Sequence, residues 1–244
     1  MSKTFVKYYF QDPGTGKWTH YKPGRFNGYT TLKMDDAFTA MILGRPAQRG
    51  VTQTPEEAYV LYSAVRDTVK LGGAIAEVGV NRGGSARVIC EAKGDTALYL
   101  CDTFEGMPNE KVDLGKDAWP TDVRTHTATG VEFVADYVSA FPNVHFVKGV
   151  FPESVEAHQA LGMADLRFRV VHLDVDLYAC TLSCLQWFWP RMLPGGRVIS
   201  HNYSLTGGRW GNTPGVKEAF SEFFAGREHL VVEVAETQCL VVKP

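Results

Sequence analysis

The feature that most constrains the fold of this chain is the alternation of short apolar segments with helix-like segments. Five apolar segments have the length and composition of buried strands: Ala74–Val80, Ala97–Asp102, Val144–Gly149, Phe168–Asp174 and Gly196–His201. Segments with helical periodicity lie between most of them, and glycine or proline ends several of these helices. Because strands that alternate with helices form βαβ units with right-handed crossovers, the sequence predicts an α/β fold with a mainly parallel sheet.

The two ends of the chain depart from this alternation. Residues 229–243 contain two apolar runs around a short polar turn, which predicts a C-terminal antiparallel hairpin. Residues 1–52 are rich in glycine, proline and aromatic residues and show no clear period. We therefore expect an α/β domain over residues 53–244, preceded by an extension or cap over residues 1–52. This extension either contacts the substrate or another copy of the chain, or simply packs on the surface.

Two helix starts carry the sequence pattern of a capping box. In this pattern a Ser or Thr side chain and a Glu or Gln three residues later satisfy each other's free backbone N–H groups. Thr54 and Glu57 form one such pair, with Pro55 in the first turn, and Thr129 and Glu132 form the other. The spacing predicts a helix after each pair.

The composition argues against several classes of partner. The formal net charge is −2 and the Lys and Arg residues are scattered, so neither a nucleic-acid partner nor a membrane surface is expected. No apolar run is long enough to span a bilayer, and the N-terminus lacks the apolar core of a signal peptide. The five cysteines form no CxxC pair and lie in apolar stretches, which indicates reduced core thiols. We expect a cytoplasmic protein.

A glycine-rich turn follows the first predicted strand and opens a helix. Gly79 and Gly83 allow the backbone to approach a ligand, but a dehydrogenase fingerprint would need glycine where Asn81 stands. Glu77 is a carboxylate in an otherwise apolar strand, and Asp102 ends the next strand, where an acidic residue can bind ribose hydroxyls. The pattern favours a nucleoside ligand over a bare tight turn. Without a phosphate-binding motif, that ligand is expected to be S-adenosylmethionine.

Polar residues also follow the fourth and fifth predicted strands. Asp174 and Asp176 come directly after one apolar run, and His201 and Asn202 come after the next. In open α/β sheets, ligands bind beyond the carboxyl ends of the strands, so these four residues are expected to share one crevice. They could hold a metal ion, remove a proton from a substrate, or satisfy backbone groups at the strand ends.

Six segments of the chain together resemble one enzyme family. They occur in the order EVGVNRGGSA, CDTFEGMP, GVFPES, HLDVDLY, WPRMLPGGRVI and GVKEAFSEF. The chain resembles the macrocin O-methyltransferase (TylF-type) family of S-adenosylmethionine-dependent, metal-dependent sugar O-methyltransferases. The resemblance spans roughly residues 70–225, and CDTFEGMP and HLDVDLY are its most specific segments.

This resemblance implies a Rossmann-like class I methyltransferase fold, with a seven-stranded sheet and helices on both faces. It also implies methylation of a deoxysugar hydroxyl in antibiotic or other natural-product biosynthesis, on a nucleotide-activated or glycosidically attached sugar. The residues expected to bind the cofactor are Glu77, Gly79, Asn81, Gly83, Ser85, Asp102, Thr103, Phe104, Phe151 and Asp174.

The resemblance further implies a divalent cation, usually Mg²⁺, with Asp174 as a ligand and Asp176 as the catalytic base. Where the family typically has two aspartates after the fifth strand, this chain has His201 and Asn202. An amide oxygen suits Mg²⁺, whereas a ring nitrogen suits Mn²⁺ or another transition metal better. We expect Asp174, His201 and Asn202 to hold the cation, with Mg²⁺ or Mn²⁺ as the ion.

Two alternatives remain open. In the first, no metal takes part, His201 is the base, Asn202 orients the acceptor hydroxyl, and the acceptor is a sugar or a phenol. In the second, the chain is a non-catalytic S-adenosylmethionine-binding module that has lost the metal site.

Other residues are weaker candidates for contact with the acceptor. Tyr178 and Tyr203 flank the two polar turns and could hydrogen-bond or stack on a sugar. Trp119 lies in a long segment that could close over the site, and Arg209 lies in a glycine-rich one. The expected partner is a small sugar or glycoside, and the aromatic N-terminal extension suggests a homo-oligomer.

Overall fold

The chain divides into two compact units, residues 1–50 and 51–244, each described here by itself. A computed structural model describes residues 8–11, 18–21, 38, 41, 53–117, 129–204, 213–235 and 237–244. In the first unit, strands β1 (Tyr8–Gln11) and β2 (Trp18–Tyr21) pair as an antiparallel ladder. The aperiodic composition of this region had not predicted these strands.

The second unit alternates strands and helices along the chain, as the apolar pattern predicted. Its strands are β3 (Ala74–Val78), β4 (Leu98–Asp102), β5 (Val144–Lys148), β6 (Phe168–Leu173), β7 (Met192–Ser200), β8 (Val231–Glu233) and β9 (Cys239–Val242). Its α-helices are α2 (Pro55–Asp67), α3 (Gly84–Lys93), α4 (Val131–Val138), α5 (Ser154–Ala157), α6 (Tyr178–Phe188) and α7 (Pro214–Phe223). Short 3-10 turns connect several of them: Val69–Leu71, Asn109–Lys111, Gln159–Leu161, Met163–Asp165, Trp189–Arg191 and Glu228–Leu230.

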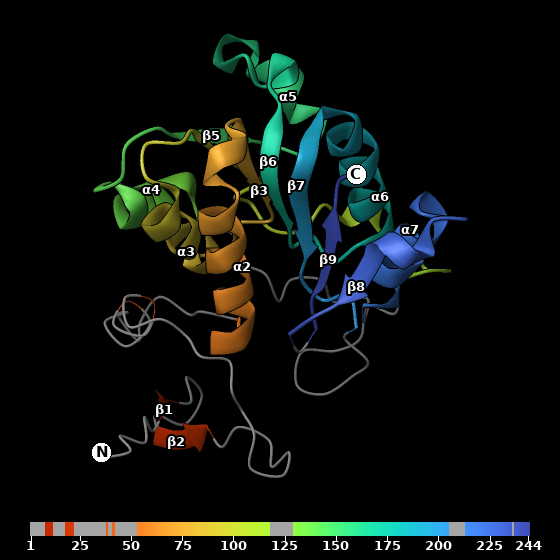
Figure 1. Ribbon diagram of the computed structural model, residues 1–244, viewed down its shortest axis with the longest axis horizontal. Coiled ribbons are helices and arrows are strands. Elements are labelled where there is room, and N and C mark those ends of the chain that lie inside the picture. The colour runs from red at the N-terminus through yellow and green to blue at the C-terminus, as the bar shows by residue number, and fades with distance from the viewer. Residues whose placement is uncertain are drawn as a thin grey trace. The chain divides into compact units, whose positions relative to one another are not determined.

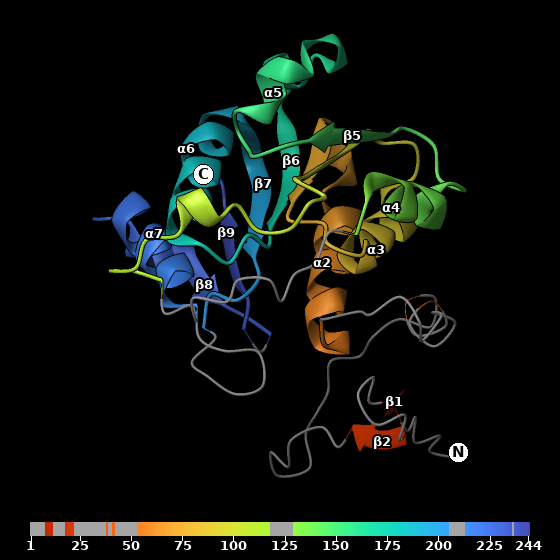
Figure 2. The ribbon, with the colours of Figure 1, turned by 180° about the vertical axis from the view of Figure 1, so that it is seen from behind.

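Within the described residues, the strands of the second unit form one seven-stranded sheet in the order β5-β4-β3-β6-β7-β9-β8. The pairs from β5 through β7 are parallel, whereas β9 runs antiparallel to both β7 and β8. The predicted mainly parallel sheet and C-terminal antiparallel hairpin are therefore confirmed. Figures 1 and 2 show α2, α3 and α4 on one side of this sheet and α6 and α7 on the other.

The central strands are buried along their whole length, which explains their continuous apolar sequences. Every residue of β3 and of β6 is buried, because helices cover both faces of a parallel sheet. β4 pairs with one side of β3 and β6 pairs with the other side, so the strand order reverses next to β3. The connection after β3 leads to β4, and the connection after β6 leads to β7 on the opposite side. The crevice between these two connections is the usual place for a ligand.

The two predicted capping boxes have different outcomes. Thr54 caps α2, with the reciprocal hydrogen bonds to Glu57 in place. The second prediction was wrong: α4 begins after Gly130, which has φ 73° and no side-chain cap. The Thr129 hydroxyl instead donates to the carbonyl of Asn81, 2.9 Å away, so a contact with the glycine turn displaces the local cap.

Two further properties of the described residues bear on the predictions. All five cysteines are buried free thiols, as the sequence indicated. Among the helices that the structure describes, none is both long and apolar enough to cross a membrane.

Candidate active site

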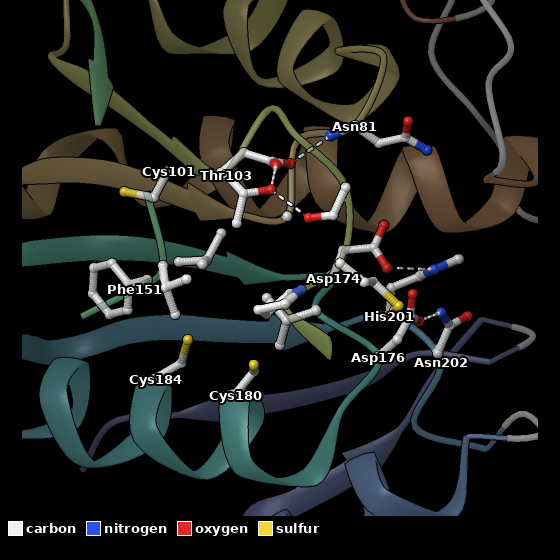
Figure 3. A pocket seen from close by; sticks show the side chains of 18 of the residues that line it. Asn81, Cys101, Thr103, Phe151, Asp174, Asp176, Cys180, Cys184, His201 and Asn202 are labelled. Carbon is white, nitrogen blue, oxygen red and sulfur yellow. Dashed lines mark hydrogen bonds and ion pairs between the residues drawn. The ribbon is translucent and has the colours of Figure 1, made fainter. Parts of the chain in front are cut away.

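A pocket of about 290 Å³ lies beyond the carboxyl ends of β3, β4, β6 and β7. The following residues line its walls: Thr54, Glu57, Val78, Gly79, Asn81, Cys101, Asp102, Thr103, Phe104, Gly106, Met107, Pro108, Thr129, Gly149, Val150, Phe151, Asp174, Val175, Asp176, Cys180, Cys184, His201, Asn202 and Thr237. Figure 3 shows the acidic and polar residues from β6 and β7 at one end and an apolar group at the other.

The glycine turn brings the ends of β3 and β6 into backbone contact. Gly79 has φ 87°, and a Cβ atom there would lie 2.0 Å from the carbonyl oxygen of Asp174. The amide of Asp174 in turn donates to the carbonyl of Val78 at 2.9 Å. Only glycine combines this left-handed conformation with so close an approach, so Gly79 fixes the position of Asp174 at the pocket wall.

Asp102, at the end of β4, holds the other side of this turn. Its Oδ2 atom accepts hydrogen bonds from the amides of Val80 and Asn81 at 2.7 and 2.9 Å. Its Oδ1 atom accepts one from the amide of Phe104 at 2.8 Å. Thr103 and Phe104 follow directly and also line the pocket. The carboxylate therefore organises the turn in addition to facing the pocket.

The opposite end of the pocket is apolar (Figure 3). The ring of Phe151 stacks on Phe188 with a centroid separation of 5.0 Å, and the thiols of Cys101, Cys180 and Cys184 lie nearby. Burial raises the pKa of the Cys180 thiol to about 12 and also raises those of the other two. Protonated thiols are weak hydrogen-bonding groups, so this wall suits a flat apolar ligand group.

At the polar end, His201 lies between two carboxylates. Its Nδ1 atom is 3.1 Å from Oδ1 of Asp174, and its Nε2 atom is 3.3 Å from Oε2 of Glu57. Burial works to lower the pKa of His201, but the two carboxylates outweigh it and the pKa stands well above its usual value. For Glu57, burial works to raise the pKa, and the contacts with His201, Thr54 and Thr237 lower it overall. The geometry and the pKa directions both indicate an imidazolium.

Asp176 and Asn202 form a second pair at the same end. The side-chain amide of Asn202 donates to Oδ1 of Asp176. Both residues have left-handed backbones, with φ 59° and 60°. Five non-glycine residues in the described part of the chain have positive φ, and four of them, including Asn81 and Phe104, line this pocket. Such conformations are uncommon outside glycine and gather at functional sites, which supports a site here.

A buried polar row runs behind the pocket wall. His172 Nδ1 is 2.9 Å from Oε1 of Glu77, and His172 Nε2 is 3.2 Å from Nε2 of Gln53. Ser85 also hydrogen-bonds Glu77, and burial raises the pKa of this carboxyl. Glu77, Ser85 and Gly83 are not among the residues that line the pocket.

The residues predicted to contact the acceptor are not brought together. The Tyr178 hydroxyl donates to Oε2 of Glu222 at 2.6 Å, and Tyr203 packs edge-on against Phe220. Neither tyrosine is among the residues lining the pocket. Trp119 and Arg209 lie outside the described residues.

The donors predicted for a divalent cation are not arranged to hold one. Each ring nitrogen of His201 lies within ion-pair distance of a carboxylate oxygen, an arrangement that favours a proton on both nitrogens over a lone pair directed at a metal. Because a carboxylate oxygen accepts hydrogen bonds, Asn202 presents its amide nitrogen, not its oxygen, to Asp176. Within the described part of the chain, no group of three or more His, Cys, Asp or Glu side chains is placed to bind a metal ion.

Sequence reasoning missed Glu57 and Thr237 as parts of this site. The amide and hydroxyl of Thr237 donate to Oε1 of Glu57 at 3.1 and 2.8 Å. The capping box already accounted for Glu57, and Thr237 lies in the turn before β9, so neither carried a local signal. A buried glutamate that also accepts from two distant elements is visible only once the chain has folded.

The arrangement of these side chains suits the removal of a proton from a hydroxyl group. Asp176 is a carboxylate at the pocket wall that can accept a proton from a hydroxyl placed beside it. Its partner Asn202 fixes the carboxylate, and the imidazolium of His201 partly offsets the negative charge of Glu57 and Asp174. The apolar end and these groups line the same pocket, so a ligand could bridge the two ends.

The chain is similar to a family of sugar-modifying enzymes in sequence. The model of the macrocin O-methyltransferase (TylF) family matches residues 59–228. The chain is 32% identical over 172 residues to the 8-demethyl-8-(2,3-dimethoxy-alpha-L-rhamnosyl)-tetracenomycin-C 4'-O-methyltransferase of Streptomyces olivaceus, covering 64% of this chain and 62% of that protein. It is 29% identical over 175 residues to the mycinamicin III 3''-O-methyltransferase of Micromonospora griseorubida, covering 66% of this chain and 63% of that protein. The matched segment thus spans less than two thirds of each relative.

Solved structures share the fold. The O-methyltransferase NovP aligns with a TM-score of 0.62 at 23% identity, over 81% of this chain and 84% of that one. The calicheamicin methyltransferase CalS11 aligns with a TM-score of 0.64 at 18% identity, over 76% of this chain and 78% of that one. The sheet described above is therefore that of a class I methyltransferase.

Proposed function

Since the chain belongs to the macrocin O-methyltransferase (TylF) family, we propose that it transfers a methyl group from S-adenosylmethionine to a hydroxyl of a deoxysugar. The two relatives described above are named as O-methyltransferases, one acting on a rhamnosyl-tetracenomycin and the other on mycinamicin III. The acceptor proposed for this chain is of the same class, either a nucleotide-activated sugar or a sugar attached to an aglycone.

The pocket lining suits this cofactor. The apolar wall with Phe151 and Cys184 offers a surface for a purine ring, and Asp102 is proposed to contact the ribose. The carboxylate of Asp174 favours a ligand that carries positive charge. When bound, S-adenosylmethionine supplies a methyl group that its sulfonium already activates. The chain then has to align the acceptor oxygen and remove its proton.

The observation that carries the proposal is the placement of Asp176. This carboxylate lines the pocket beside Asp174, and Asn202 holds one of its oxygens. We assign Asp176 as the base that accepts the hydroxyl proton and Asn202 as the residue that orients it. His201 is a poorer base, because both of its nitrogens face carboxylates and its raised pKa keeps it protonated.

The divalent cation expected from the resemblance is not part of this proposal, because the donor set does not fit one. Every step assigned here uses the side chains of the chain itself. A role of residues 1–52 at the acceptor or in a homo-oligomer, and a cytoplasmic location, remain predictions.

The direct test is transfer of an isotope-labelled methyl group. The purified protein is incubated with labelled S-adenosylmethionine and a panel of dTDP-deoxysugars, rhamnosylated polyketides and simple catechols, and the products are identified by mass spectrometry. We expect the label on a sugar hydroxyl. Label on the catechols alone would favour the phenolic alternative. Cofactor binding without transfer to any acceptor would favour a non-catalytic module.

A further inference from the structure

The polar end of the pocket gathers three acidic side chains from two separate parts of the chain. Glu57 comes from α2, whereas Asp174 and Asp176 follow β6. Glu57 is 2% exposed, and buried charges are costly unless each meets an opposite charge or a hydrogen-bond donor. A group of this kind either binds a cation from solution or contains one of its own.

His201 supplies that positive charge from within the chain. It is 8% exposed, and each ring nitrogen faces a carboxylate oxygen, at 3.1 Å for Asp174 and 3.3 Å for Glu57. A neutral imidazole has one N–H and could satisfy only one of these contacts. Carboxylate oxygens within ion-pair distance of both nitrogens therefore favour the doubly protonated form.

The contacts of Glu57 exceed what a helix cap needs. Its Oε2 atom accepts from the amide of Thr54 at 2.9 Å, which completes the capping box. Its Oε1 atom accepts from the amide and hydroxyl of Thr237, and this hydroxyl lies 3.3 Å from the amide nitrogen of Asn202. Glu57 is thus anchored on two sides before it meets His201, and its network reaches the residue that holds Asp176.

On the premise of the proposed function, we infer that Glu57 is a positioning residue for methyl transfer. With Asp174 it holds His201 as an imidazolium whose charge takes the place of a divalent cation beside Asp174 and Asp176. Two expectations follow. The protein does not bind a divalent cation at this site, and removal of the Glu57 charge changes the protonation of His201 without uncapping α2.

Cation binding is tested with Mn²⁺ alone, followed by electron paramagnetic resonance, without cofactor or acceptor. We expect no saturable binding to the wild-type protein at millimolar Mn²⁺. The His201→Asp variant replaces the internal cation with a carboxylate among oxygen donors. We expect this variant to bind Mn²⁺ saturably, at concentrations at least about tenfold below those at which the wild type still shows no saturable binding. Saturable wild-type binding that disappears in Asp174→Asn would overturn the inference, and so would failure of a folded His201→Asp variant to gain binding.

The role of Glu57 is tested by the ring ¹⁵N shifts of His201 at pH 8. We expect both nitrogens to be protonated in the wild type and one to lose its proton in Glu57→Gln. Glutamine removes the charge and still offers one oxygen that can accept from the Thr54 amide, as glutamine does at the third helical position of a capping box. Glu56→Gln is the matched control, since it removes a neighbouring charge from the same helical turn and should leave the ring unchanged. An unprotonated nitrogen in the wild type, or an unchanged ring in Glu57→Gln, would overturn the inference.

These measurements need no turnover, so they separate this inference from the proposed function. If methyl transfer fails while the Mn²⁺ and ring results are as expected, the function is wrong and the internal cation stands. If transfer occurs, its rate after exhaustive chelation is expected to stay within about twofold of the untreated protein, because no Lewis acid is required to lower the pKa of the hydroxyl. A large loss that Mg²⁺ or Mn²⁺ restores would overturn the inference alone.

Discussion

Gly79 shows at the scale of one residue how the backbone sets the site. Its left-handed conformation and the 2.0 Å approach of a Cβ atom to the carbonyl of Asp174 leave no room for a side chain. We predict that Gly79→Ala lowers the free energy of unfolding by about 2–4 kcal/mol, from backbone strain together with overpacking. Urea denaturation with matched m-values measures this loss.

Gly226 provides the control for that prediction. It has a similar φ of 75°, but a Cβ atom there would meet nothing within 4 Å. Gly226→Ala should therefore cost only the strain, about 1 kcal/mol. Equal losses for the two variants would show that the contact with Asp174 has no energetic consequence.

Individual site residues were predictable only where strand ends determine their place. Asp174 and His201 follow neighbouring parallel strands, so their proximity follows from the alternation of strands and helices. The ion pair of His201 with Glu57 did not follow, because the capping box had already explained Glu57. The left-handed backbone of Asp176 was equally hidden, since aspartate only tolerates this conformation and does not require it.

At the scale of elements, helix α6 seals the apolar end of the pocket. Cys180 and Cys184 lie one helical turn apart and face the same pocket as Cys101 of β4. The sequence indicated core thiols for the pair on α6, and their burial and raised pKa values agree with packing.

This packing predicts slow thiol chemistry. A thiolate is the reactive form, and with a pKa of about 12 only roughly one Cys180 thiol in ten thousand is ionised at pH 8. We predict little reaction of the folded protein with iodoacetamide at pH 8, rising about tenfold per pH unit while the fold persists. All five thiols should react at pH 8 in guanidinium chloride. Rapid alkylation of Cys180 in the folded protein at pH 8 would contradict this prediction.

Most helices and strands were predictable, because buried segments carry apolar residues in a regular pattern. The apolar runs identified the five strands that became β3 to β7, and the polar turn identified the hairpin of β8 and β9. The start of α4 was not predictable, because Thr129 hydrogen-bonds the distant Asn81 and not its own helix. The start of β7 at Met192 was also missed, since Pro194 and Gly195 interrupt the apolar pattern that marks its later residues.

At the scale of the whole second unit, sheet order explains where the pocket lies. β3 is flanked by β4 and β6, and the connections after these strands lead away from one another. The resulting crevice is lined by Asp102 at the end of β4 and by Asp174, Asp176, His201 and Asn202 after β6 and β7. An apolar wall and a group of carboxylates thus lie at the two ends of one pocket, an arrangement that suits the proposed transfer from a nucleoside cofactor to a hydroxyl.

The central claim is that Asp176 removes the proton of the acceptor hydroxyl. Its direct test is the rate of methyl transfer by Asp176→Asn, with binding of S-adenosylmethionine measured in parallel and Asp165→Asn, at an exposed position outside the pocket, as the control. The account predicts that Asp176→Asn lowers kcat by about 10²–10⁴-fold, the contribution typical of a positioned base, while cofactor affinity changes little. Transfer at the wild-type rate by Asp176→Asn would contradict it.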